Sequence, residues 1–207
     1  MTALSTSTAA ALPLAESTTP VRGQGRPTPW WGMVCLIMTE ATIFAALIGS
    51  YFFYRAGSKQ WPPPGVEEPK LTLSIIMSFV LWGSSIPMLM AERGIKHGRQ
   101  RALRFGLMAA WIMGAAFVGY SMKDFAELKF RWGENAYSSI YYTTVGLHTF
   151  HVFVGLMMSI VVQIKAWQRK FSAERHVTVQ VYAMYWHFVD AVWLVVMPTF
   201  ILSPHLK

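Results

Sequence analysis

Five long apolar runs divide the chain, at residues 31–54, 71–91, 105–122, 141–164 and 181–202. A helix needs about 20 predominantly apolar residues to cross roughly 30 Å of hydrocarbon, and each run is near that length. No segment alternates polar and apolar residues over about ten positions, as the strand of a membrane barrel would. The pattern therefore predicts an all-α polytopic membrane protein, a bundle of five transmembrane helices.

Polar segments flank these runs. Residues 1–29 are rich in Ser, Thr, Ala and Pro and predict a flexible cytoplasmic N-terminal tail, without the positive start and long apolar region of a cleaved leader. Residues 30–207 then form one five-helix domain. Because the third run is short, we expect its helix to begin about one turn earlier, with Arg101 and Arg104 reaching towards the membrane surface.

The composition supports the membrane class. The chain is 54% hydrophobic and 14% charged, whereas soluble domains carry about 25% charged residues. Cys35 is the single cysteine of the sequence, which excludes an internal disulfide and a metal site built from several cysteines. A net charge of +8 would suggest nucleic acid in a soluble protein, but here it is better explained by the loops of a membrane protein, and no nucleic-acid partner is expected.

Basic residues are unequally divided between the two sides of the predicted bundle. The tail and the loops at 92–104 and 165–180 carry 11 Lys and Arg, and the segments on the other side carry 7. By the positive-inside rule, the N-terminus is predicted to be cytoplasmic and the C-terminus outside.

Two acidic residues, Glu40 and Asp190, lie inside the apolar runs. A charged residue near the middle of a membrane costs at least about 2.5 to 3.5 kcal/mol, so each is a candidate functional residue that needs a partner. At about 1.5 Å per residue, both lie roughly 14 Å from the cytoplasmic end of their helices.

Three histidines supply candidate partners for these acids. His148 and His151 share one face of the fourth run, and His187 shares a face of the fifth with Asp190. His151 comes out about one turn further from the cytoplasmic side than Glu40. A polar layer of carboxyl and imidazole groups is therefore expected to run through the bundle.

These residues have several possible roles. One interpretation of the histidines and Asp190 is that they only form hydrogen bonds between helices. Glu40 is a candidate lipid anchor or proton-linked group. Haem or metal ligation is disfavoured, because a bis-histidine haem needs opposed histidines at one depth and only His187 lies opposite the pair on the fourth run. No catalytic residue and no metal ligand is assigned.

Two motifs make the chain recognisable. The fourth run contains GLHTFHVFVG at 146–155 and the fifth contains YWHFVDAVW at 185–193, after a first run that holds Thr39-Glu40. With these motifs in this order, residues 30–202 resemble subunit III of the haem-copper respiratory oxidases, in its short five-helix bacterial form. There are departures, because longer members have two further N-terminal helices, and where the family often has Gln and then Glu, this chain has Ser121 and Asp124.

The resemblance implies a non-redox core subunit of a proton-pumping cytochrome c oxidase, which reduces dioxygen to water. It implies packing on subunit I, with subunit II in the same complex, and haem and copper held by those partners and not by this chain. It also implies bound phospholipid and a role in sustaining proton uptake and turnover stability. In the family, Glu40 matches a carboxyl associated with carbodiimide reactivity and with the proton-uptake side.

Other functions remain open at this point. Subunit III of a quinol oxidase and a homologue associated with nitric oxide reductases are alternatives within the family. A small proton-linked transporter is an alternative of another class, although the runs lack the broken half-helices and inverted repeat of many transporters. The expected location is the bacterial inner membrane.

Overall fold

The computed structural model describes residues 25–64, 66 and 71–205. Most of the predicted tail, up to residue 24, lies outside the described residues. Within these residues, five segments are long and apolar enough to cross a membrane: Thr28–Gly57, Leu71–Lys96, Gln100–Glu127, Ala136–Trp167 and Val177–Leu202. The described part of the chain contains helices and no strand. The predicted all-α bundle of five spans is confirmed.

Each of the five crossings is longer than the apolar run that predicted it. Their bounds are α1 (Thr28–Gly57), α2 (Leu71–Gly83), α3 (Ser85–Lys96), α4 (Gln100–Glu127), α5 (Ala136–Trp167) and α6 (Val177–Met197). A π-helix, η1 (Pro198–Leu202), and a 3₁₀ turn, η2 (Ser203–His205), follow α6.

The second crossing is divided into α2 and α3 at Ser84. Pro87 has no backbone N–H to donate to the Gly83 carbonyl, and its ring crowds that carbonyl, so a regular helix is interrupted one turn before the proline. The interruption places Ser84 and Ser85 beside α6, where both make hydrogen bonds.

The start of α4 confirms that the third helix begins before its apolar run. Arg104 donates from Nε to the Ala166 carbonyl at 3.2 Å, and its guanidinium lies over the Trp167 ring at 4.9 Å. The charged head of Arg104 is thus held at the end of the bundle, which allows its helix to continue past the apolar residues.

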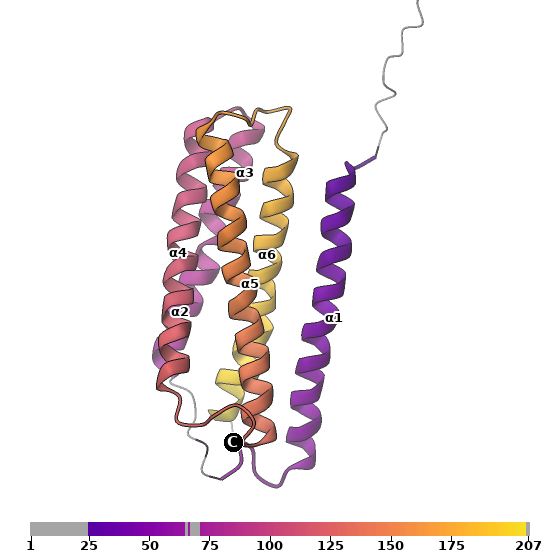
Figure 1. The fold of residues 1–207 in the computed structure, drawn as a ribbon, viewed down its shortest axis with the longest axis vertical. Helices are drawn as coiled ribbons and strands as arrows, with labels where there is room; N and C mark the ends of the chain where they lie inside the picture. Colours follow the sequence, from indigo (N-terminus) through magenta and orange to yellow (C-terminus); the bar gives the residue numbers. More distant parts are fainter. Residues whose placement is uncertain (1–24, 65, 67–70, 206–207) are drawn as a thin grey trace, which may run out of the picture.

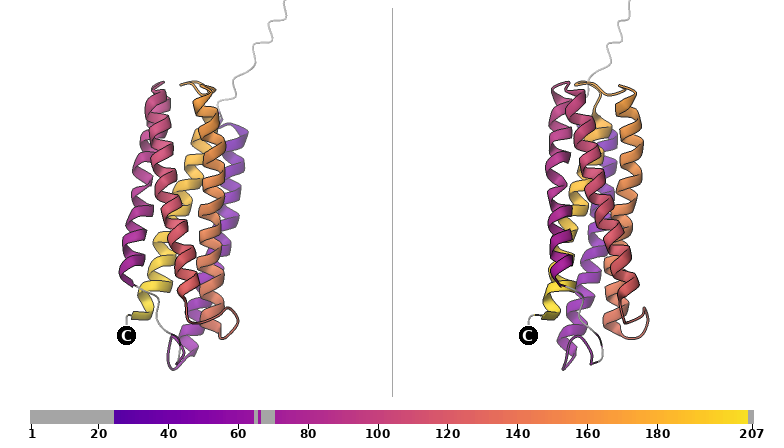
Figure 2. Two further views of the ribbon diagram at one scale, coloured as in Figure 1. Left: turned by 60° about the vertical axis from the view of Figure 1, so that its left-hand side comes forward. Right: turned by 90° about the vertical axis from the view of Figure 1, so that its left-hand side faces the viewer.

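The helices form an elongated bundle, with α1 at one side against α5 and α6 (Figure 1). Two further views show the α2–α3 crossing on the side away from α1 (Figure 2). Only 11% of the most apolar stretch of α1 is buried within the chain, against 56% for the last crossing. Helix α1 therefore presents most of its surface outward.

Among the described residues, Trp186 is the largest fully buried side chain, and it packs where α4, α5 and α6 meet. A Cβ atom added at Gly114 of α4 would lie 2.6 Å from the Trp186 ring, and one at Gly155 of α5 would lie 3.1 Å from it. Trp186 also donates from Nε1 to Ser84 Oγ at 2.8 Å. These contacts fix the indole between two glycines.

Reporter fusions test the predicted orientation. A reporter at the N-terminus and one inserted after Arg99 should report the cytoplasm, and one at Lys207 the outside, because the three more basic segments share one side. Finding both termini on one side would contradict five crossings, whereas a uniform inversion would contradict only the charge argument.

Candidate functional site

Glu40 of α1 and His151 of α5 form a pair inside the bundle. Glu40 Oε2 lies 3.0 Å from His151 Nε2, with side chains 24% and 12% exposed. The other ring nitrogen, Nδ1, is 2.8 Å from the Leu147 carbonyl, and because a carbonyl only accepts, Nδ1 must donate. A hydrogen bond at Nε2 then requires one proton between the two groups, held either by the carboxyl or by the imidazole.

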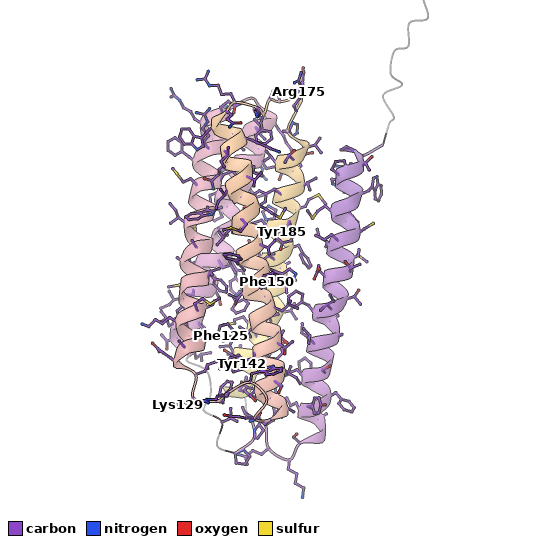
Figure 3. All side chains as sticks on the ribbon, viewed as in Figure 1. Phe125, Lys129, Tyr142, Phe150, Arg175 and Tyr185 are labelled. Atoms are coloured by element: carbon purple, nitrogen blue, oxygen red, sulfur yellow. The ribbon has the colours of Figure 1, made fainter. Side chains whose placement is uncertain are left out.

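Aromatic residues surround this pair. Tyr185 donates from its hydroxyl to the His151 carbonyl at 3.0 Å, which ties α6 to the same turn of α5. The Phe44 ring lies 5.4 Å from the His151 ring. Tyr185 lies well inside the length of the bundle, whereas Arg175 and Lys129 mark its opposite ends (Figure 3). The Glu40–His151 pair is therefore far from both charged ends.

Asp190 belongs to a second cluster, between α3 and α6. Ser85 Oγ donates a short hydrogen bond to Asp190 Oδ2 and lies 3.1 Å from His187 Nδ1. Since a serine hydroxyl has one hydrogen, Ser85 accepts from His187 when it donates to Asp190. Asp190 is 6% exposed. This serine was not among the predicted site residues, and it links the two residues that share a face of α6.

His148 joins neither cluster. It is fully buried and stacks on Trp193, with ring centroids 4.7 Å apart and an interplanar angle of 21°. Phe117 and Phe44 lie edge-on to its ring. Within the described part of the chain, neither ring nitrogen has a hydrogen-bond partner. The expected polar layer is thus two separate clusters, with His148 packed as an aromatic ring.

Sequence reasoning also missed the serines of the second crossing. Trp193 donates from Nε1 to Ser78 Oγ at 2.8 Å, one of several contacts that join α6 to α2 and α3. Serine in a membrane helix commonly bonds across helices, at about 0.6 kcal/mol per contact. The spacing of Trp186 and Trp193 by two helical turns was the available signal, since it places both indoles on one face of α6.

An apolar groove lies between α1 and α6, beside the Glu40–His151 pair. Its volume is about 540 Å³. Its walls include Phe44, Ile48 and Phe52 from α1 and Phe188, Val192 and Val195 from α6. Phe44 closes the groove towards His151. A hydrocarbon chain matches the chemistry of this lining.

Metal donors are dispersed through the described residues. No three of the His, Cys, Asp and Glu side chains described there gather closely enough to hold a metal ion. Cys35 is exposed on α1.

Comparison with known proteins identifies the family. Residues 24–202 match the family model described as cytochrome c oxidase subunit III. Cytochrome c oxidase subunit 3 of Synechocystis sp. is 33% identical over 168 residues, covering 80% of this chain and 71% of the relative. The subunit 3 of Thermostichus vulcanus is 28% identical, covering 79% of this chain and 82% of the relative.

The match extends to more distant relatives. Cytochrome c oxidase subunit 3 of Arabidopsis thaliana is 26% identical over 171 residues, and the aligned region spans 79% of this chain and 64% of that protein. The family model covers all five crossings and both clusters. The chain therefore belongs to the cytochrome c oxidase subunit III family.

Proposed function

We propose that this chain is a supporting, non-redox subunit of a terminal oxidase in the bacterial inner membrane. In this role it packs on subunit I, in a complex with subunit II, and haem and copper reside in those partners. The observation that carries the proposal is the Glu40–His151 pair, a carboxyl and an imidazole 3.0 Å apart within a matched subunit III sequence. The relatives' names favour cytochrome c as the electron donor.

The hydrogen-bond geometry of the pair supports a proton-linked role. Because His151 Nδ1 donates to Leu147, the proton between Nε2 and Glu40 resides on one partner or the other. In either arrangement the hydrogen bond from Nδ1 to the Leu147 carbonyl stays in place. In the proposed role, the pair contributes to sustained proton uptake by the assembled oxidase.

The α1–α6 groove supports phospholipid binding. Its aromatic and aliphatic lining fits an acyl chain, and that lining includes Ala41, the residue next to Glu40. A lipid seated there would cover the outward face of α1 close to the pair. We therefore place a structural phospholipid of the complex in this groove.

Carbodiimide labelling tests the role of Glu40. A hydrophobic carbodiimide reacts with protonated carboxyls in apolar surroundings, so we expect it to label this chain. Glu40→Gln should abolish the labelling and leave assembly unchanged, because glutamine keeps the shape and its amide N–H donates to His151 Nε2 as the protonated carboxyl does. Glu92→Gln is the matched control, since Glu92 pairs with Lys96 at 2.6 Å in a partly exposed salt bridge. Labelling that survives in Glu40→Gln would contradict the assignment.

Co-purification tests membership of an oxidase. Affinity purification of the tagged chain in mild detergent should recover haem proteins with a Soret band. After the complex is dissociated, that band should remain with the partners and not with this chain. Recovery of the chain alone from membranes that contain active oxidase would contradict the proposal, and a haem that stays with the isolated chain would contradict the non-redox role.

A further inference from the structure

A second site lies at the end of the bundle where α3 turns into α4. The turn encloses a pocket of about 340 Å³. Its lining is Met90, Arg93, Gly94, His97, Arg99 and Ala102. None of these residues belongs to the Glu40–His151 pair or to the α1–α6 groove, so the pocket is independent of the proposed supporting role.

The charge of the pocket is positive. Arg93 and Arg99 both line it, and no carboxylate does. The nearby acid Glu92 is already paired with Lys96 at 2.6 Å. Among the described residues, neither arginine has a carboxylate within salt-bridge distance. Two guanidinium groups without a counter-charge are suited to an anion, and arginine binds the oxygens of a phosphate with two parallel hydrogen bonds.

The polar wall is held in place by the backbone. His97 Nδ1 lies 2.8 Å from the Arg93 carbonyl and must donate to it. Arg99 donates from its backbone N–H to the Gly94 carbonyl at 2.8 Å. The turn therefore has a fixed shape, with both arginine backbones tied to α3.

The floor of the pocket is apolar. Gly94 and Ala102 are in such close contact that a Cβ on Gly94 would lie 2.6 Å from the Ala102 Cβ. Met90 is 59% exposed and continues the apolar surface of α3 away from the turn. Because α3 ends the crossing Leu71–Lys96, we expect this floor to lie at the membrane surface. An apolar floor does not stabilise a hydrated ion, whereas it does stabilise the acyl chains of a lipid.

We propose that this pocket binds the phosphate of an anionic phospholipid head group. Arg93 and Arg99 contact the phosphate oxygens, and the acyl chains run along Met90 into the hydrocarbon. Basic pockets between membrane helices bind acidic head groups in this way.

Lipid titration of the full chain tests the proposal. The purified chain in neutral detergent is titrated with phosphatidylglycerol or phosphatidylcholine, and bound lipid is counted by native mass spectrometry. Phosphatidylglycerol should bind more tightly, and Arg93→Gln or Arg99→Gln should each weaken it by about tenfold or more, as loss of a charged hydrogen bond predicts. Arg93→Lys, which keeps the charge, should retain part of the affinity.

Arg101→Gln is the matched control. Arg101 is an exposed arginine at the start of α4 that does not line the pocket, so its loss should weaken binding by less than either pocket variant. Equal losses at all three arginines, or no preference for phosphatidylglycerol, would overturn the site. Inorganic phosphate is also added at the same concentration as the lipid head groups. If it displaces the lipid, the pocket binds a free anion, and the assignment to a phospholipid is overturned.

Discussion

Gly114→Ala is expected to destabilise the bundle by about 1 to 3 kcal/mol, the range for forcing extra volume into a packed core. The added Cβ would lie 2.6 Å from the Trp186 ring. The indole has no room to withdraw, because Gly155 is on its other side and its Nε1 is bonded to Ser84. Thermal unfolding of the purified chain in mild detergent measures the effect.

Gly119→Ala is the control on the same helix. A Cβ at Gly119 meets nothing within 4 Å. Alanine is otherwise the better helix former by about 1 kcal/mol, so this variant should be as stable as the parent or slightly more stable. Equal unfolding temperatures for the two variants would show that the Trp186 contact does not limit packing.

The five crossings were predictable because each apolar run approaches the thickness of a membrane. The early start of α4 was also expected, from the shortness of its run, but the residues that hold Arg104 there were not. Helix α4 begins at Gln100 because Arg104 packs on Trp167 and bonds the Ala166 carbonyl, both contributed by α5. The hydropathy of the third run does not indicate which residues of α5 contact Arg104. The break between α2 and α3 had a local signal in Pro87, which hydropathy also does not register.

The candidate site was partly predictable from depth along the helices. Glu40 and His151 were expected about one turn apart and are paired at 3.0 Å, since long side chains span that difference. Ser85 was missed, because its contact with Asp190 depends on the helix interruption and on which way α3 turns. His148 shares a face with His151, but it is fully buried and its ring stacks on the Trp193 ring. The spacing of the two histidines along the chain does not indicate this neighbour, because Trp193 belongs to another helix.

Removing this subunit from the assembled oxidase is expected to leave the initial rate of oxygen reduction largely intact and to reduce the number of turnovers before the enzyme loses activity. If haem and copper lie in the partners, the absorption spectrum and the initial rate should be largely retained. If the Glu40–His151 pair and the lipid groove sustain proton uptake and the integrity of the complex, activity should then decline in fewer turnovers. The complete complex, purified in parallel, is the control.

Oxygen consumption followed to exhaustion, plotted against turnover number for the complete and the depleted enzyme, tests the supporting role most directly. The predicted result is a similar initial rate, intact metal spectra and a markedly shorter catalytic lifetime without this chain, restored when the chain is added back. Complete loss of the initial rate with the metal centres still present would contradict that role, because it would place an obligatory step within this chain. An unchanged lifetime would contradict it as well.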